Sequence, residues 1–460
     1  MQKSSLFKKW IIVSSLLVFL GAGCGGPSQA QSLATKPVTL NIWRVFDKSS
    51  TFDETMNAYQ IIHPNVSFQY KELRSDEYKK ELLQAFAEGK GPDIFSIHNT
   101  WIGEYTPLIQ PLPTSIQIPY SEIRGSIKKE TIFTLKEQPS ITQRALRSEF
   151  VDVVAQDVIR KYKANDRAET VDTIFGLPMS VDSLALYYNK ELLNAAGFPE
   201  PPKTWTEFQT QVTKLTKLGS DTSIIQSGAA VGTSKNIERS FDILSLLMMQ
   251  NGTKMVDDRN RATFAQDDNS GNILGLQALY FYTDFANPLK QVYTWNSSQP
   301  NSFNAFIAGK TAFFFGYSYH ADLIKTSSPK LQFGIAPAPQ IEGGKIVNYA
   351  NYWVETVSKS SKNANWAWDF IQFATGKDQV QKYLKSSKKP TARRALINTQ
   401  IEDENLSVFA SQTLTTQSWY KGTDAKVTEQ SLLDLIDAVL KGTDAERAIK
   451  DAENKVNQTL

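Results

Sequence analysis

Polar and apolar residues alternate in two short segments near the start of the chain. Residues 38–43 and 66–70 carry this period of two, which is typical of strands, and residues 93–97 are predicted to form a third strand. Between them, over residues 52–59 and 78–86, apolar residues recur every three or four positions, which predicts helices. The order strand, helix, strand, helix, strand predicts a parallel sheet with helices on both faces.

The rest of the chain continues to mix the two periods, which places the protein in the α/β class. Near the C-terminus, Thr443 and Glu446 have the spacing of a capping box that would open the last helix. Residues 118–147 show no clear pattern, and we expect an irregular or helical elaboration there. Further strands are predicted at 184–188, 311–315 and 331–337, and further helices at 205–218, 271–286, 303–308, 364–375, 432–440 and 445–456.

Composition and charge exclude several classes of protein. The chain has 460 residues, of which 41% are hydrophobic and 21% charged, which is ordinary globular material with room for two or more domains. Its one cysteine excludes an internal disulfide and a Cys-cluster metal site. Basic and acidic residues balance once residues 1–23 are set aside, so there is no electrostatic case for a nucleic-acid partner. We expect no metal and no cofactor.

The first residues resemble an export signal. Lys3, Lys8 and Lys9 precede an 11-residue apolar run, Trp10–Leu20, which is too short to span a bilayer and suits a signal peptide. Small residues then lead to Cys24, as in bacterial lipoproteins, although Gly21 stands where such proteins usually have Leu. We therefore predict a signal peptide over 1–23, lipidation (palmitate) of Cys24, and a flexible tether over 24–37. The predicted location is the outer face of the cell membrane.

The body of the chain resembles the extracellular solute-binding proteins of bacterial ABC importers, the group that includes maltose-binding protein. The resemblance covers nearly all of residues 36–460 and rests on the shared order of many short segments. Those segments include His63–Val66, Ala87–Phe95, Gly176–Pro178, Leu186–Leu193, Pro201–Trp205, Phe306–Ala312, Phe333–Pro337, Ser358–Asn363, Ala367–Phe370 and Pro390.

This resemblance implies a periplasmic-binding-protein fold, with two α/β lobes joined by a hinge and the solute between them. The first lobe would comprise residues 38–179 and 356–398, and the second 180–355 and 399–460. It also implies that the protein is not an enzyme, that it is a monomer, and that it delivers a sugar or oligosaccharide to an ABC permease in the membrane.

Residues expected to contact the solute are aromatic or polar. Aromatic rings cover the C–H faces of sugars, and planar polar side chains satisfy the hydroxyl groups. Trp43 and Trp101 follow predicted strands of the first lobe, where ligands of parallel sheets bind. Asp182 matches the position of a family carboxylate that accepts sugar hydroxyls. The full predicted set is Trp43, Arg44, Asn99, Trp101, Asp182, Tyr317, Tyr319, Trp353 and Glu355.

Several alternatives remain open on the sequence alone. The solute could be glycerol phosphate, a polyamine or iron, and the protein could serve as an adhesin or receptor subunit. A surface glycoside hydrolase would use a pair of carboxylates, for which Asp182 and Glu355 are candidates.

Overall fold

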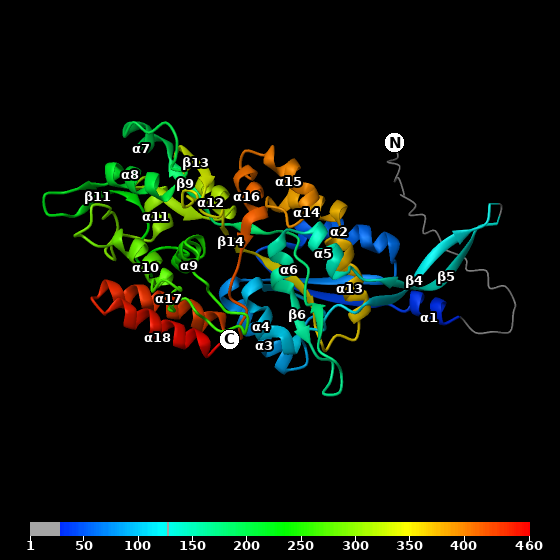
Figure 1. Cartoon of the computed structure of the whole chain (residues 1–460). Helices are drawn as coiled ribbons and strands as arrows, with labels where there is room; N and C mark the ends of the chain where they lie inside the picture. The colour runs from blue at the N-terminus through cyan, green and yellow to red at the C-terminus, as the bar shows by residue number, and fades with distance from the viewer. Residues whose placement is uncertain (1–27, 127) are drawn as a thin grey trace, which may run out of the picture.

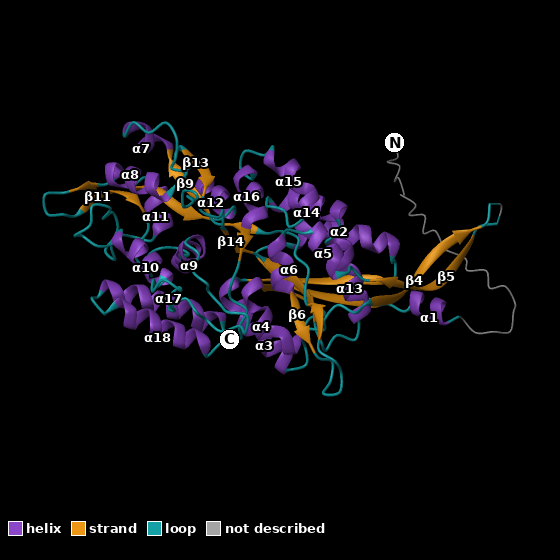
Figure 2. Cartoon of the chain, viewed as in Figure 1, coloured by secondary structure: helices purple, strands orange, loops and turns teal. Residues whose placement is uncertain are grey.

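The computed structural model describes residues 28–126 and 128–460. The predicted signal peptide and Cys24 lie outside the described residues. The chain forms two α/β lobes side by side, one on the left of Figure 1 and one on the right. In both lobes the strands lie between helices, as the colouring of Figure 2 shows. Among the described residues, no helix is both long and apolar enough to cross a membrane.

The first lobe is built on a four-stranded sheet in the order β15–β3–β1–β2. Strands β1 (Val38–Val45), β2 (Val66–Leu73) and β3 (Ile94–His98) run parallel, as the alternating pattern predicts. Strand β15 (Trp353–Val357) returns from late in the chain and pairs antiparallel with β3. The predicted lobe boundary at 355/356 would divide β15, whereas the strand lies with the first lobe as a whole.

Helices cover both faces of this sheet, and the periodicities correctly predict three of them, α2, α3 and α13. Helix α2 buries Phe52, Met56 and Tyr59, three residues on one stripe. The helices are α2 (Ser49–Ile62), α3 (Ser75–Ala87), α4 (Ile102–Tyr105), α5 (Gln143–Glu149), α6 (Asp152–Val158), α13 (Ala364–Ala374), α14 (Lys377–Ser387) and α15 (Arg394–Ile401), with 3-10 turns η1 (Asn99–Trp101) and η2 (Thr106–Leu108) and a hairpin of β6 (Ile159–Tyr162) and β7 (Val171–Ile174).

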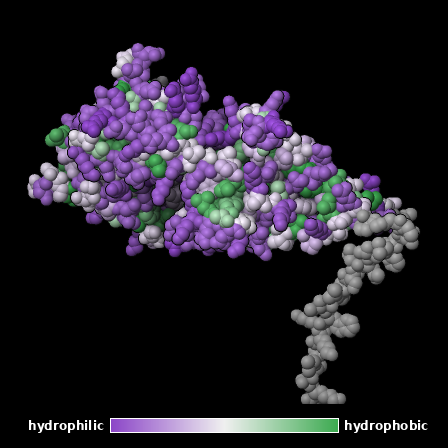
Figure 3. Space-filling view, turned by 90° about the horizontal axis from the view of Figure 1, so that it is seen from below, coloured by the Kyte–Doolittle hydropathy of each residue, from purple (hydrophilic) through white to green (hydrophobic). Residues whose placement is uncertain are grey.

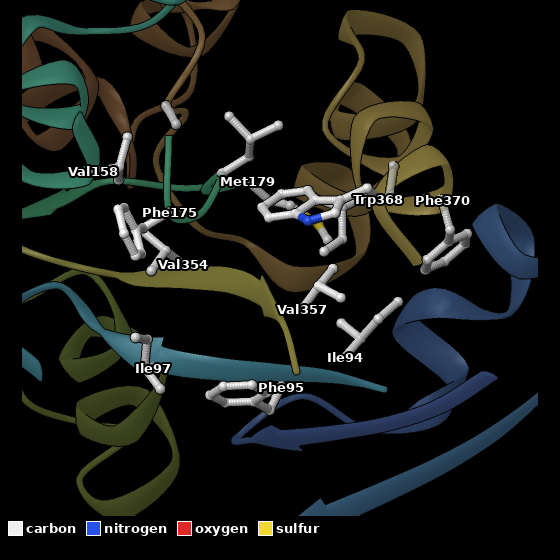
Figure 4. Packing of buried hydrophobic residues seen from close by; sticks show 14 of the residues in the cluster. Ile94, Phe95, Ile97, Val158, Phe175, Met179, Val354, Val357, Trp368 and Phe370 are labelled. Atoms are coloured by element: carbon white, nitrogen blue, oxygen red, sulfur yellow. The ribbon is translucent and has the colours of Figure 1, made fainter. Parts of the chain in front are cut away.

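The core of the first lobe joins segments from both ends of the chain. Figure 4 shows Trp368 of α13 beside Met179, with Val357 of β15 and Ile94 of β3 below them. Trp368 is fully buried, and its indole N–H donates to the Gln110 carbonyl at 3.0 Å. Because the partners of α13 come from the N-terminal segment, neither part can bury its apolar surface alone.

The second lobe has a five-stranded mixed sheet in the order β10–β11–β12–β9–β13. Its strands are β9 (Ala185–Asn189), β10 (Lys217–Leu218), β11 (Ile224–Ala229), β12 (Thr311–Gly316) and β13 (Phe333–Pro337), and its helices are α7 (Lys190–Ala195), α8 (Trp205–Leu215), α9 (Ser240–Gln250), α10 (Leu274–Asp284), α11 (Ser302–Ile307), α12 (Tyr319–Ser327), α16 (Ser407–Gln412), α17 (Ala425–Leu440) and α18 (Ala445–Asn457), with the 3-10 turn η3 (Thr413–Thr415).

Two details differ from the sequence-based prediction. Helix α8 ends at Leu215 rather than 218, because Lys217 and Leu218 pair with β11. Helix α18 is capped by Asp444, whose side chain accepts from the Arg447 N–H, so the predicted cap at Thr443 is one residue early.

The two lobes are joined by a small sheet and by crossing segments. Strands β8 (Asp182–Ser183), β14 (Asn348–Asn351) and β16 (Thr416–Gln417) form a three-stranded sheet at the junction. In the described residues the apolar cores separate near residues 181–184, 347–350 and 397–409, where the chain passes from one lobe to the other.

Residues 118–147, predicted to be irregular or helical, form mostly a β-ribbon. Strands β4 (Ser115–Arg124) and β5 (Glu130–Pro139) pair over their full length and project from the outer end of the first lobe (Figure 1). Helix α1 (Gln29–Thr35) packs on this ribbon, although the sequence suggests a flexible tether there. Ser28 caps the helix by accepting from the Gln31 N–H at 3.1 Å, which favours helix over coil.

Candidate functional site

Four ring systems gather where β3 ends, β15 begins and β1 turns away. Trp353 lies opposite His98 in the β15–β3 ladder, and its ring centroid is 5.3 Å from Trp101 and 5.8 Å from Phe46. Phe46 is 59% exposed and holds a positive φ of 70°, which turns the chain after β1. We call Phe46, His98, Trp101 and Trp353 the aromatic face.

Polar groups at the lobe junction continue the aromatic face. The Nε2 atom of His98 lies 3.2 Å from Oδ1 of Asn351, and Asn351 pairs with Asp182 in the β14–β8 ladder. Asp182 Oδ2 accepts from the Ser318 N–H at 3.0 Å and the Ser318 hydroxyl at 2.6 Å, and Oδ1 accepts from the Ser183 N–H at 2.8 Å. Burial raises the pKa of Asp182 to about 6, against the opposing effect of these hydrogen bonds.

The second lobe contributes a tyrosine and a paired arginine. Tyr319 is 50% exposed and stacks on His320 with ring centroids 4.1 Å apart. Arg239 opens α9 and donates two hydrogen bonds to Asp242, at 2.6 and 2.9 Å. Burial and the charge of Arg239 lower the pKa of His98 to about 4.

Sequence reasoning missed both Phe46 and Arg239. The Arg-x-x-Asp spacing just before an apolar helix was a usable signal for Arg239, because such a pair meets on one helical turn. Nothing in the local pattern distinguishes Phe46 from a core residue.

The structure places Arg44 and Glu355 inside the first lobe rather than on its surface. The Arg44 guanidinium is ion-paired with Glu355 and, at 2.7 Å, with Asp47. Asp47 also accepts from Lys389 at 2.7 Å, and the Ser96 hydroxyl donates to Glu355 at 2.8 Å. Arg44, Asp47, Glu355 and Lys389 form what we call the Arg44 cluster. Arg44 and Glu355 are only 4% and 3% exposed, so this expectation of solute contact is corrected.

The pKa values in the Arg44 cluster follow from burial and pairing. Burial raises the pKa of Glu355, while the Arg44 charge opposes the rise. For Asp47, burial acts in the same direction, but the charges of Arg44 and Lys389 prevail and hold its pKa below the usual range.

Three other predicted residues are held by contacts within the protein. Trp43 lies within β1, which continues to Val45, and its ring packs under the Lys71 ammonium at 4.3 Å. Tyr317 is 1% exposed, and its hydroxyl donates to Asp242 at 2.6 Å in the second-lobe core. Asn99 is 4% exposed, and its amide donates to Asp157 at 3.1 Å. Each is held by a partner that the sequence does not reveal.

Asp157 connects the first lobe to segments that lead to the second. Besides Asn99, it accepts from the Tyr352 hydroxyl at 2.8 Å and from the Ser418 hydroxyl at 2.5 Å. Burial raises the pKa of Asp157, which the charge of Lys421 partly offsets. We call Asp157, Asn99, Tyr352 and Ser418 the Asp157 cluster. It lies beside a pocket of about 360 Å³ lined by Ser418, Trp419 and Lys421 among others.

Comparison with known proteins decides the family. Residues 145–381, more than half of the chain, match the family model described as "Bacterial extracellular solute-binding protein". The chain belongs to the bacterial extracellular solute-binding proteins. The predicted fold class is thereby confirmed, together with the resemblance on which it rested.

Individual relatives of this solute-binding protein are distant. A "Probable ABC transporter-binding protein" of Deinococcus radiodurans is 29% identical over 222 residues, which are 47% of this chain and 51% of that protein. The match therefore spans about half the length of this relative. The galactooligosaccharide-binding protein of Bacillus subtilis is 20% identical over 86% of this chain and 82% of its own.

The solved structures share the fold at low sequence identity. The sugar-binding protein MalE of Xanthomonas citri superposes with a TM-score of 0.69 at 18% identity, covering 92% of this chain and 97% of that one. The two-lobe architecture therefore extends over nearly the whole chain.

Proposed function

We propose that this protein captures a carbohydrate between its lobes and delivers it to the permease of an ABC importer. The observation that carries the proposal is the aromatic face, which lies against polar groups at the junction of the two lobes. Two of the relatives named above bind sugars according to their names. Stacked or edge-on rings beside hydrogen-bonding side chains suit a ligand with apolar faces and a polar rim.

The site residues would contact different parts of the sugar. Trp101 and Trp353 would cover the sugar's C–H face from the first lobe, and Tyr319 would do so from the second. Asp182, with a pKa of about 6, is mostly ionised at neutral pH, and its Oδ1 retains a lone pair for a hydroxyl because a carboxylate oxygen can accept twice. Phe46, Asn351 and Arg239 extend the set.

Solute binding would close the two lobes. Three crossings allow the lobes to rotate without unfolding, as in hinge motions generally. A solute that touches both Trp101 and Tyr319 binds the closed form more tightly, and this difference in affinity shifts the population. The expected observable is a smaller radius of gyration in solution scattering when solute is added.

The proposal includes membrane attachment and release of the solute unchanged. Lipidation at Cys24 would hold the protein at the outer face of the membrane next to its permease. Glu355 is committed to Arg44 and Ser96, so it is not available as the second carboxylate of a glycosidase pair with Asp182. Cys24→Ser followed by fractionation tests the first point, and intact recovery of oligosaccharides tests the second.

Calorimetry against a sugar panel tests the function itself. The panel includes glycerol phosphate, spermidine and ferric citrate as the competing solutes. For a sugar that binds, Trp101→Ala or Trp353→Ala should weaken affinity about tenfold or more, because a stacking ring contributes on the order of 1–3 kcal/mol.

Trp43→Ala is the matched control, since Trp43 lies in the same sheet but under Lys71. Its affinity should stay within about twofold of wild type, a difference below ~0.5 kcal/mol. Equal affinity in all three variants would place the solute elsewhere, and binding confined to a non-sugar would overturn the carbohydrate assignment.

A further inference from the structure

A second pocket lies in the first lobe, between the base of the β4–β5 ribbon and helices α2 and α13. It has a volume of about 250 Å³, and none of the residues predicted to bind solute lines it. Figure 1 places the ribbon and α13 at the end of the molecule that points away from the second lobe. We call it the outer pocket; its lining residues include Tyr59, His63, Tyr120, Asp369, Gln372 and Phe373.

The carboxylate of Asp369 forms part of the outer pocket and is 13% exposed. It accepts from the Tyr59 hydroxyl at 2.7 Å and from the Tyr120 hydroxyl at 3.4 Å. His63 Nε2 lies 3.7 Å away, but burial lowers the pKa of His63 to about 4, so the imidazole is neutral at neutral pH.

Asp369 therefore has no cationic partner among the described residues. No Lys or Arg of residues 28–126 and 128–460 forms an ion pair with it. Burial also raises its pKa, in line with a carboxylate whose charge is poorly compensated. A buried charge in this situation costs free energy unless something neutralises it. The Arg44 cluster of the same lobe shows the usual solution, a cation within 3 Å.

Aromatic rings cluster around His63, beside the carboxylate. The His63 ring centroid is 4.7 Å from Tyr59, 5.0 Å from Tyr120 and 5.1 Å from Trp366. Phe373 lies 5.4 Å from Tyr59 and also lines the pocket. The faces of aromatic rings carry a partial negative charge and attract cations, and this attraction is stronger where water is excluded.

We propose that the outer pocket binds a small organic ammonium ion, with its charge at Asp369 and its alkyl groups against Tyr59, Tyr120 and Phe373. The volume is below the usual range of ~300–1,000 Å³ for small-molecule sites, so only a small amine fits. A multivalent metal ion suits the lining less, because the described residues contain no group of three His, Cys, Asp or Glu side chains able to hold one. This site is separate from the aromatic face, so the proposal does not depend on the solute being a sugar.

Tetramethylammonium is the test ligand, and neopentyl alcohol, which has a quaternary carbon in place of the quaternary nitrogen and one added hydroxyl group, is the neutral comparison. Calorimetry on the full protein at pH 7.5 should show saturable binding of the cation and none of the alcohol. Asp369→Asn keeps the shape of the side chain but removes its charge, and should weaken binding tenfold or more. Asp378→Asn, an exposed carboxylate on the next helix, is the matched control and should leave binding unchanged.

Two further measurements locate the site, and they test the proposal even if Asp369→Asn does not fold. The chain has three histidines, so the imidazole signals of His63 can be assigned by comparison with His63→Gln. Tetramethylammonium should shift those signals and leave those of His98 and His320 unchanged. Phe373→Leu, which removes one wall but no charge, should weaken binding several-fold.

Four results would overturn the proposal. The first three are equal binding of the alcohol and the cation, unchanged affinity in both Asp369→Asn and Phe373→Leu, and a shift of the His98 signals rather than those of His63 when the cation is added. A sugar that displaces the cation would likewise place it at the aromatic face. Failure of sugar binding alone would leave the outer pocket unaffected.

Discussion

The interior of the first lobe and the junction between the lobes hold buried carboxylates in different ways. In the Arg44 cluster, Asp47 and Glu355 meet Arg44 and Lys389, so two negative charges face two positive ones. At the junction, Asp157 and Asp182 are held mainly by hydroxyl and amide donors. All four partners in the Arg44 cluster come from the first lobe, whereas the junction donors come from both sides.

This difference suggests two separate roles. A fully paired cluster inside one lobe fixes that lobe, because loss of one partner leaves a buried charge uncompensated. Neutral donors are individually weaker, at about 0.5–1.5 kcal/mol each, and can be exchanged as segments shift. The junction can therefore change its geometry at modest cost, as the proposed lobe closure would require.

The largest effect should come from breaking the Arg44 cluster. Arg44→Met leaves Asp47 and Glu355 buried with one cation fewer, and should lower the free energy of unfolding by about 3–5 kcal/mol. Urea denaturation measures it. Arg74→Met is the control, since its pair with Asp76 is 76% and 65% exposed and should matter by less than ~1 kcal/mol. If the two variants were equally stable, the ion pairs of the Arg44 cluster would not fix the first lobe, and the contrast with the junction would fail.

Much of the architecture behind this comparison is predictable from sequence. Alternation over residues 38–43 and 66–70 is a local signal for β1 and β2, and the order of strands and helices through residue 97 predicts the parallel sheet that β1, β2 and β3 form. Trp101 is a candidate by the same reasoning, because the end of β3 can be located from the pattern, whereas β15, which Trp353 begins, is not among the predicted strands. The sequence also contains a signal for the ribbon, since Ile116 and Ile118 alternate with the polar residues Ser115 and Gln117 at the start of β4.

The pairings inside the lobes could not be predicted in this way. Arg44 and Glu355 are 311 residues apart, and only the fold brings them together. A charged residue at a strand end is a reasonable candidate to bind solute. The sequence does not show whether the fold pairs it with a residue of opposite charge inside the lobe. Trp43 failed for a smaller reason: β1 runs two residues further than its alternation suggests, through Arg44 to Val45.

A smaller effect is expected at the Asp157 cluster, and of a different kind. Ser418→Ala removes the donor that reaches Asp157 from the segment following β16. We expect a loss of about 1 kcal/mol in stability, together with an altered radius of gyration in the absence of solute. Ser411→Ala, on exposed α16 surface, is the control. If Ser418→Ala loses stability but its scattering curve superimposes on that of wild type, the Asp157 cluster stabilises the fold without setting the positions of the lobes.

An effect of similar size, spread over a range of pH, is the pH dependence that Asp182 confers. Its pKa is about 6 in the folded protein, above the unfolded value of ~3.9, so the folded state binds a proton more tightly. The free energy of unfolding must then fall as pH rises from about 4 to about 6, and change no further above that. The full shift would correspond to about 3 kcal/mol. Since Asp182 is partly exposed and solvent screens its charge, we expect about 1 kcal/mol.

Asp182→Asn isolates this contribution from the other buried carboxylates. Urea denaturation of both proteins at pH values between 4 and 7, without solute, should show wild type losing about 1 kcal/mol more than the variant. Asp157, Glu355 and Asp369 titrate in both proteins, so their contributions cancel in the difference. If the free energies of unfolding of the two proteins changed equally with pH, the hydrogen bonds from Ser318 and Ser183 would compensate the charge of Asp182 fully. In that case Asp182 would resemble the paired carboxylates of the lobe interior rather than those of the junction.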